Sequence, residues 1–244
     1  MHARTIEYTD GEITFIGQLY VGAATAGKRP GVVVFPEAFG LGEHARERAQ
    51  RLAQLGYVAL AADVIGGGKL FPDIPSVAPI MQALFADRAG WRARARAALD
   101  ALAAQPEVDG GKLAAIGFCF GGVTALELAR SGADVAEIAT FHAGLLAELP
   151  EDAGRNRARV LICHGAGDPL VKKEVIDGVM AEFQRDKVDW QFIYYGNAAH
   201  SFSDPEADQR NIPGLAYNRH ADQRSWRAMS AFFEEVFGPQ GGAA

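Results

Sequence analysis

Two hydrophobic patterns alternate along the chain, short apolar runs and longer stretches with helical spacing. The run GVVVFPE at residues 31–37 is apolar and rich in valine, which is typical of a strand buried on both faces. The next stretch, EHARERAQRLAQLG, repeats apolar residues at helical spacing and ends at Gly56, a favoured residue just beyond a helix C-terminus. This order predicts a buried β-strand followed by a helix that packs against it.

The same order recurs toward the C-terminus. Further strands are predicted at residues 57–64, 112–118, 135–142, 159–165 and 189–196, and helices at 87–104, 121–130, 172–186 and 220–237. Strands that alternate with helices favour a mostly parallel central sheet covered by helices on both faces and joined by right-handed crossovers. The chain is therefore predicted to have an α/β fold.

Three segments depart from this rhythm. Near the N-terminus, TIEYT and EITFIGQLYV alternate apolar and polar residues around Asp10-Gly11, which predicts an antiparallel hairpin at one edge of the sheet. Residues 66–86 mix glycines, prolines and aromatic residues, so we expect an insertion of lid-like character there. Residues 239–244 are expected to form a flexible tail.

Composition narrows the classes of protein to consider. A chain of 244 residues, 49% hydrophobic and 22% charged, suits a single globular domain over residues 1–244. The formal net charge of -6 argues against nucleic acid as a partner, because such partners require clustered Lys and Arg. No stretch approaches the roughly 18 apolar residues of a membrane span, and the N-terminus lacks a signal-peptide pattern, so we expect a cytoplasmic protein that does not bind membranes.

The most informative motif is GFCFG at residues 117–121, between a predicted strand and a predicted helix. A Gly-x-Ser-x-Gly sequence at such a turn is a nucleophile elbow, and here cysteine replaces the serine. The helix N-terminus would stabilise a thiolate and later an oxyanion. A buried structural cysteine is the alternative, which we adopt for Cys163 in mid-strand. We predict that Cys119 is a nucleophile.

A nucleophilic cysteine requires a base and a group that orients the base. Asp168 and His200 follow Cys119 in the chain order of hydrolase triads, and each lies just after a predicted strand. Their alternative roles are a turn or helix-capping aspartate and an exposed loop histidine. We expect His164 to be structural and His142, which could line the pocket, to take no part in the chemistry. The spacing of the potential ligands matches no zinc pattern, and the chain has no nucleotide-binding glycine motif, so we expect neither a metal nor another cofactor.

These motifs resemble those of the dienelactone hydrolase family within the α/β-hydrolase superfamily. The resemblance extends over nearly the whole chain, through PEAFG, GFCFGG, HGAGDP, AHSF and SWRAMSAFFEEVF. It implies an α/β-hydrolase fold and the hydrolysis of a small-molecule lactone or carboxylic ester through a thioester on Cys119. Other members of the superfamily nearly all carry serine at this position.

The resemblance also implies roles for four further residues. Glu37 falls where the family has a glutamate close to the resting cysteine, which is thought to help convert the thiol into a thiolate as substrate arrives. The backbone N–H groups of Phe120 and Ala38 would form the oxyanion hole. Ser201 would help to position the substrate.

One position departs from the family pattern. The better-known lactonases place an arginine four residues after the histidine, where this chain has Asp204. An aspartate there would repel a substrate carboxylate by about 1 to 4 kcal/mol. Arg88 or Arg92, near the insertion, could supply the missing positive charge. Tyr217 lies in a loop that we expect to border the pocket.

Several alternatives remain open on these residues. The substrate could be a lactone, a carboxylic ester or a thioester, since the same machinery serves all three. A catalytically silent binding module with the same fold is the alternative outside the enzymes. The protein is expected to be a monomer or a homodimer.

Overall fold

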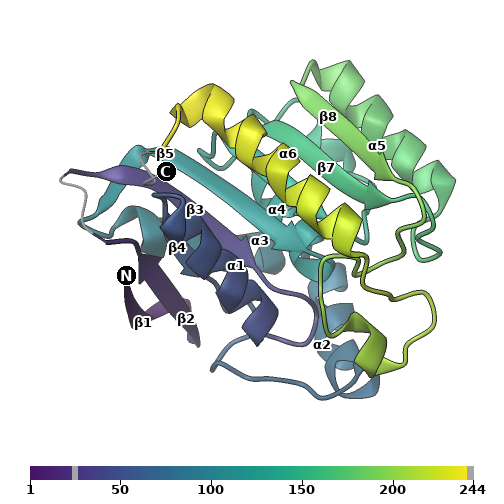
Figure 1. Ribbon diagram of the computed structural model, residues 1–244, viewed down its shortest axis with the longest axis horizontal. Helices are drawn as coiled ribbons and strands as arrows, with labels where there is room; N and C mark the ends of the chain where they lie inside the picture. The colour runs from purple at the N-terminus through teal and green to yellow at the C-terminus, as the bar shows by residue number, and fades with distance from the viewer. Residues whose placement is uncertain (24–26, 241–244) are drawn as a thin grey trace.

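The computed structural model describes residues 1–23 and 27–240, and a mixed eight-stranded sheet organises them (Figure 1). In spatial order the strands are β1 (His2–Asp10), β2 (Ile13–Val21), β4 (Val58–Ala61), β3 (Arg29–Phe35), β5 (Val108–Phe118), β6 (Glu137–Phe141), β7 (Arg159–Gly165) and β8 (Trp190–Tyr195). β2 pairs antiparallel with both β1 and β4, and the remaining pairs are parallel. The predicted parallel sheet with an N-terminal hairpin at one edge is confirmed.

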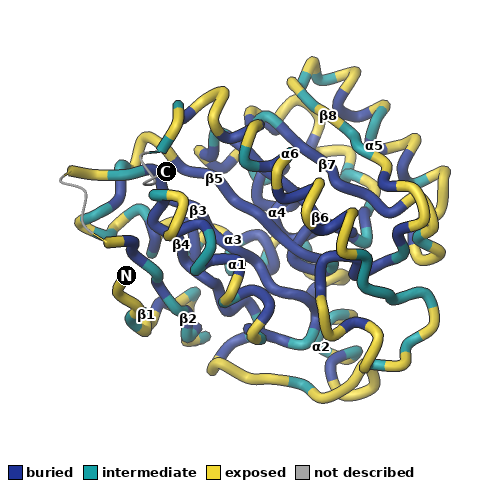
Figure 2. The backbone as a smooth tube through the Cα atoms, in the orientation of Figure 1, coloured by how far each residue is buried: buried dark blue, intermediate teal, exposed yellow. Residues whose placement is uncertain are grey.

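Helices cover both faces of the sheet. In the described part of the chain they are α1 (Glu43–Gln54), α2 (Ile74–Ala86), α3 (Arg88–Ala103), α4 (Phe120–Arg130), α5 (Lys173–Asp186) and α6 (Arg219–Phe237). The side chains of α1 and α6 form one buried layer that includes Leu52 and Phe233, and those of α2 to α5 join the opposite layer, which includes Trp91 and Phe183. Figure 2 shows the buried strands between these layers.

Residues 66–86 are more regular than the sequence pattern predicts, because they contain helix α2. Asp73 caps this helix by accepting the Ser76 N–H at 2.9 Å, and Pro75 occupies the first turn, where no N–H is needed. The prolines that suggested an irregular insertion therefore include one that marks a helix start. Of the predicted tail, residues 241–244 lie outside the described residues.

None of the described helices combines the length and the apolar character needed to cross a bilayer.

The turn between β5 and α4 requires glycine at two positions. A Cβ atom on Gly117 would lie 2.0 Å from the carbonyl oxygen of Gly121, and one on Gly121 would lie 2.2 Å from the carbonyl oxygen of Phe35. Backbone atoms occupy both places, so no side chain can be accommodated without moving the elements apart. The two glycines therefore allow β3, β5 and the start of α4 to approach closely around Cys119.

We predict that Gly117→Ala lowers the free energy of unfolding by about 2 kcal/mol or more, because the added methyl group meets backbone rather than a movable side chain. Gly178→Ala is the matched control, since a Cβ at this position on α5 meets no atom within 4 Å. That substitution should raise stability by about 0.5 to 1 kcal/mol. Urea unfolding of the two variants tests this, and equal stability of Gly117→Ala and the wild type would contradict the close approach.

Candidate active site

Cys119 occupies the turn between β5 and α4 in a backbone conformation that cysteine rarely adopts. Its φ is 52° and its ψ is -113°. Backbone hydrogen bonds hold the turn, from the Cys119 N–H to the Phe141 carbonyl at 3.0 Å and from the Gly122 N–H to the Cys119 carbonyl at 3.1 Å. The residue is half-buried, so the thiol stands at the N-terminus of α4 with access to solvent.

Three side chains from separate loops meet at the carboxyl edge of the sheet. His200 Nε2 lies 3.0 Å from Cys119 Sγ, and His200 Nδ1 lies 2.7 Å from Asp168 Oδ2. The other carboxylate oxygen, Asp168 Oδ1, accepts the Leu170 N–H at 2.8 Å. Asp168 therefore shapes its turn and orients the imidazole at the same time. It does not cap α5, whose N-cap is Lys172.

The protonation of His200 is set by its two neighbours. Burial acts to lower the pKa of His200, but the Cys119 sulfur and the Asp168 carboxylate outweigh it and raise this pKa to about 10. The His200 ring is therefore protonated at neutral pH, with Nε2 directed at the sulfur.

The loop that carries His200 is fixed by backbone contacts on two sides. The His200 N–H donates to the Gly214 carbonyl at 3.1 Å, and the His200 carbonyl accepts the Ala216 N–H at 3.0 Å. On the β7 side, a Cβ on Gly165 would lie 2.5 Å from the Ala198 carbonyl oxygen. The segment 204–218 and the end of β7 thus hold the imidazole in place.

His142 and His164 lie outside the hydrogen-bonded chain of Asp168, His200 and Cys119. The fully buried His142 places Nε2 2.8 Å from Ser203 Oγ, and its ring centroid lies 5.5 Å from that of His200. Burial, together with the neighbouring His200, lowers the pKa of His142 well below its ordinary value, so this ring is neutral. Across residues 1–23 and 27–240, no three His, Cys, Asp or Glu side chains are grouped to hold a metal ion.

Ala38 and Phe120, the expected oxyanion-hole residues, lie on neighbouring segments. β3 and β5 pair in register with Phe35 opposite Gly117, so the chain leaves both strands side by side. Trp91 stacks on Phe120 with ring centroids 4.8 Å apart and fixes the first turn of α4. N–H groups in the first turn of a helix have no partner within that helix. A Cβ on Gly121 would lie 2.5 Å from the Pro36 carbonyl oxygen, so the segment that leads to Ala38 contacts the start of α4.

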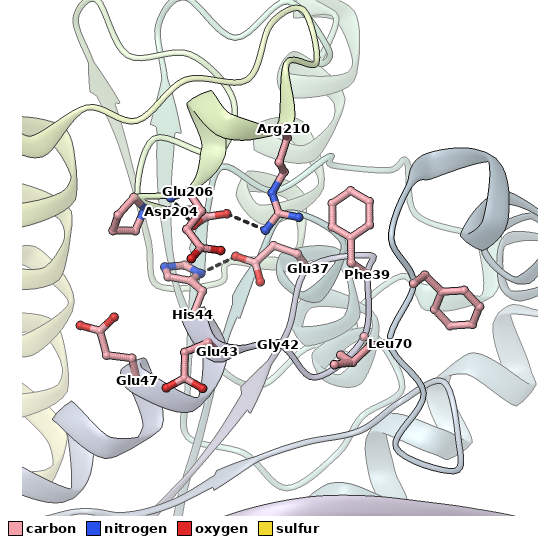
Figure 3. Close-up of a pocket in the computed structure, with 13 residues that line it drawn as sticks. Glu37, Phe39, Gly42, Glu43, His44, Glu47, Leu70, Asp204, Glu206 and Arg210 are labelled. Atoms are coloured by element: carbon pink, nitrogen blue, oxygen red, sulfur yellow. Dashed lines mark hydrogen bonds and ion pairs between the residues drawn. The ribbon is translucent and has the colours of Figure 1, made fainter.

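Glu37 makes its hydrogen bond to a residue that the sequence analysis did not single out (Figure 3). Its Oε1 contacts Nδ1 of His44, which lies on α1, and Arg48 Nε donates to His44 Nε2 at 3.0 Å. Burial acts to raise the pKa of Glu37, but the contact with His44 and the nearby Arg210 outweigh burial and lower it. Glu37 is therefore a buried carboxylate that points toward α1. The sequence did contain a signal for this contact, because His44 and Arg48 lie four residues apart on a predicted helix and so share one face.

A cavity of about 300 Å³ opens beside Glu37 (Figure 3). Phe39 and Phe71 contribute apolar wall, and Asp204 and Arg210 contribute charge. Asp204 is buried and accepts a hydrogen bond from Arg210 Nη2 at 3.0 Å, while the Arg210 guanidinium lies 4.6 Å from the ring centroid of Phe39. The negative charge expected at Asp204 is therefore paired. A second hollow of about 200 Å³ shares Phe39 and Arg210 with the first.

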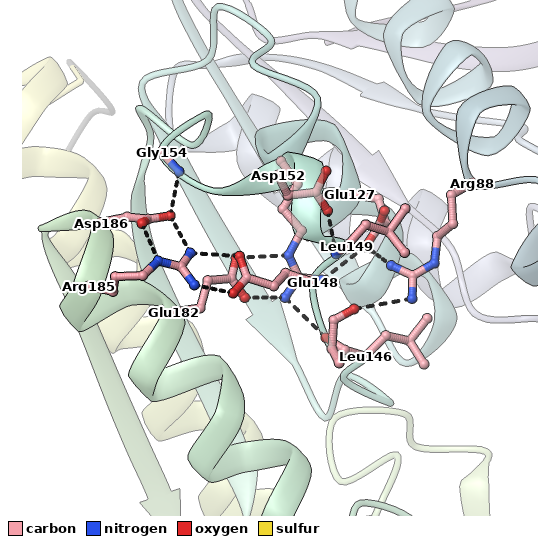
Figure 4. A network of polar contacts seen from close by, with 12 residues as sticks. Arg88, Glu127, Leu146, Glu148, Leu149, Asp152, Gly154, Glu182, Arg185 and Asp186 are labelled. Carbon is pink, nitrogen blue, oxygen red and sulfur yellow. Dashed lines mark hydrogen bonds and ion pairs between the residues drawn. The ribbon is translucent and has the colours of Figure 1, made fainter.

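Neither Arg88 nor Arg92 supplies the cation that was expected to compensate for Asp204. Both lie on α3 and face α4, where they pair with the fully buried Glu127 at 2.6 and 2.8 Å (Figure 4). Arg92 also pairs with Asp152 at 2.6 Å. These arginines therefore anchor α3 to α4 instead of lining the cavity beside Glu37.

Ser201 and Tyr217, the other expected substrate contacts, have local partners. Ser201 is buried in a left-handed conformation with φ of 58°, and its carbonyl accepts the Asp204 N–H at 2.9 Å. The Tyr217 hydroxyl donates to Asp222 at 3.2 Å, and Tyr217 does not line the cavity beside Glu37. Ser201 thus shapes the loop after the histidine, while Tyr217 is tied to α6.

Comparison with known proteins places this chain in a family. The sequence profile of the dienelactone hydrolase family matches residues 17–237. A solved structure described as m3DLH is 65% identical, covers 97% of this chain and 98% of its own, and superposes with a TM-score of 0.95. A dienelactone hydrolase-like promiscuous phosphotriesterase from metagenomic libraries is 59% identical over 97% of this chain and 99% of its own, with a TM-score of 0.96. A Salmonella typhimurium protein named "Putative carboxymethylenebutenolidase" is 27% identical over 89% of this chain and 82% of its own.

We predict that iodoacetamide alkylates Cys119 at pH 7 at least about tenfold faster than it alkylates Cys163. His200, whose pKa is raised to about 10, is protonated at this pH and lies 3.0 Å from the Cys119 sulfur, where a positive charge favours the reactive thiolate. His200→Ala should remove most of this difference. Cys163, whose pKa burial raises to about 12, is the internal control in the same peptide-mass measurement. Equal rates at the two cysteines of the wild type would argue against activation by His200.

We predict that Glu127→Ala lowers the free energy of unfolding by about 3 kcal/mol or more, because it removes a shared partner of Arg88, Arg92 and Arg130 inside the protein. Asp100→Ala, which breaks an exposed pair with Arg96, is the control and should cost about 0.5 kcal/mol or less. Denaturant unfolding compares the two. Similar losses of unfolding free energy in the two variants would show that the buried network adds little to stability.

Proposed function

Because this chain belongs to the dienelactone hydrolase family, we propose that it hydrolyses a lactone or carboxylic ester through a thioester on Cys119. The observation that carries the proposal is the unbroken chain of contacts from Asp168 through His200 to the sulfur, at 2.7 and 3.0 Å. These are the distances at which a base is oriented and a nucleophile is activated.

In the first half of the proposed reaction, the Cys119 thiolate attacks the substrate carbonyl carbon. The carbonyl electron pair moves to oxygen, where the N–H groups of Phe120 and Ala38 stabilise the charge. When the tetrahedral intermediate collapses, the bond to the leaving oxygen breaks and the His200 imidazolium gives that oxygen its proton. An alcohol, or the opened end of a lactone, is released and a thioester remains.

In the second half, water hydrolyses the thioester. His200 Nε2, now neutral, takes a proton from the water as its oxygen attacks the acyl carbon, and the sulfur leaves as a thiolate. The acid is released, and the imidazolium again faces the thiolate. Asp168 holds Nδ1 through both halves, so the same nitrogen gives and takes the proton.

In this mechanism the Cys119 sulfur faces His200 and Glu37 is bound to His44, so Glu37 acts through its charge and not by converting the thiol into a thiolate as substrate arrives. It is buried next to Ala38, and its lowered pKa keeps it ionised at neutral pH. A negative charge beside the oxyanion hole affects both the thiolate and the incoming carbonyl group.

The cavity beside Glu37 is lined by neither Cys119 nor His200, so we propose that it receives the part of the substrate that does not react. Its volume of about 300 Å³ lies at the lower end for ligand sites and favours a small group, and Phe39 and Phe71 would contact an apolar part of it. The partly exposed side chain of Arg210 could pair with a polar or anionic group of the substrate in place of Asp204. Lactones, aryl esters and thioesters of this size form the substrate panel that separates the remaining alternatives.

Phosphotriesters are a second candidate substrate class. The solved structure described as a promiscuous phosphotriesterase is 59% identical to this chain and superposes over 97% of it. The same thiolate would attack phosphorus in place of carbon, and the bond from phosphorus to the aryl oxygen would break as that oxygen takes the His200 proton. Water, deprotonated by His200, would then release the phosphodiester from the sulfur. Adding one aryl phosphotriester to the panel tests this possibility.

We predict that Cys119→Ala lowers kcat/KM for a small aryl ester by at least about a thousandfold, since the nucleophile is lost while the fold remains. Cys163→Ala is the control, because Cys163 is fully buried in β7 and should leave turnover intact. Mass spectrometry of the wild type mixed with substrate should show an acyl adduct on Cys119.

Full activity of Cys119→Ala would overturn the proposed nucleophile. Absence of turnover across the whole panel, with Cys119 alkylated as slowly as Cys163, would favour a silent binding module.

A further inference from the structure

We propose that His44 is a positioning residue for the active-site thiol: it holds the Glu37 carboxylate against α1 and so prevents this charge from opposing the thiolate of Cys119. The inference rests on the proposed function, because it assumes that Cys119 reacts as a thiolate.

The strand register places Glu37 close to Cys119. Phe35 on β3 pairs with Gly117 on β5, and Glu37 and Cys119 each lie two residues further along. Neighbouring strands are about 4.8 Å apart. A Cβ on Gly121, just beyond the cysteine, would lie 2.5 Å from the Pro36 carbonyl oxygen, so the two segments still touch after the strands end. The direction of the Glu37 side chain therefore decides how much of its charge reaches the sulfur.

Two hydrogen bonds determine which nitrogen of the His44 ring carries the proton. Arg48 Nε donates to His44 Nε2 at 3.0 Å, and a guanidinium can only donate, so Nε2 carries a lone pair. The proton must then lie on Nδ1, where it is donated to Glu37. Arg48 is fixed in turn, because Nη2 donates to the Ser203 carbonyl at 2.6 Å and pairs with Asp222 at 2.9 Å. The ring is thus set to donate to the carboxylate.

The other charged groups around the pair do not replace His44. Arg210 faces Glu37, but its guanidinium already pairs with Asp204. The remaining charged residues that line the cavity are acidic: Glu43, Glu47 and Glu206. Around Cys119, His200 carries the positive charge, Asp168 lies behind it, and His142 is neutral. Every cation among these groups already has an anionic partner, so the charge of a released Glu37 would act on the neighbouring Cys119 sulfur without compensation.

Asparagine and glutamine at position 44 separate the two hydrogen bonds. In His44→Asn the amide nitrogen takes the place of Nδ1 and can still donate to Glu37. In His44→Gln the amide oxygen takes the place of Nε2 and can still accept from Arg48, while the donor to Glu37 is lost. If His44 served only in packing or in holding Arg48, the reactivity of Cys119 would not be closer to that of the wild type in His44→Asn than in His44→Gln.

The measurement is the pH profile of Cys119 alkylation by iodoacetamide, without substrate. His44→Gln should move the midpoint of this profile upward by about one pH unit, which slows the reaction below the midpoint by up to about tenfold, since a nearby carboxylate disfavours the thiolate. His44→Asn should remain within about twofold of the wild type. In a Glu37→Gln background, His44→Gln should cause no further shift.

Three results would overturn the inference: an unchanged midpoint in His44→Gln, equal shifts in both variants, or a shift that persists without the Glu37 charge. Wild-type Cys119 that reacts no faster than Cys163 would instead overturn the proposed function itself.

A measurement on the unaltered protein covers the case in which the variants do not fold. Nitrogen-15 NMR of histidine-labelled protein should show the His44 tautomer that carries its proton on Nδ1 and a lone pair on Nε2. The ring is identified by its contact with Phe118, whose ring centroid lies 4.6 Å away. A proton on Nε2 would overturn the inference.

Discussion

The contact between the Cys119 sulfur and the His200 ring is the interaction on which the rest of this edge of the sheet depends. Each partner comes from a different loop, and neither position is favourable by itself. The cysteine requires a left-handed backbone, and the histidine is removed from water. The sulfur and the Asp168 carboxylate raise the pKa of the buried ring, and Asp168 holds the ring in the orientation that brings Nε2 to the sulfur.

The surrounding fold supplies the rigidity that this contact requires. Backbone atoms lie where side chains would stand at Gly117 and Gly121, so the strained turn cannot relax without separating β3 from α4. On the opposite side, Gly214 and Ala216 hold the backbone of the histidine. Local strain at a reactive residue persists only where its neighbours leave no alternative, and here they are backbone segments rather than movable side chains.

Sequence alone predicted the sheet, its N-terminal hairpin and the residues that meet at Cys119. Those features follow from local signals: apolar runs, a glycine frame, and polar residues placed just after strands. Helix α2 was not predicted because a proline such as Pro75 is typical both of the first turn of a helix and of a loop. The partners of Arg88 and Arg92 were missed because Glu127 looks like any helical glutamate until α3 and α4 are packed together.

The pairing of Arg210 could not be predicted for the same reason. Its guanidinium lies beside Asp204 because the loop after His200 folds back on itself, and no spacing of residues in the sequence indicates that fold. The arginine and Phe39 line both of the hollows described above. One of these two side chains is long and has several rotatable bonds, and neither belongs to the chain of contacts at Cys119. Substitutions at Arg210 or Phe39 would therefore reshape both hollows without altering Cys119, His200 or Asp168.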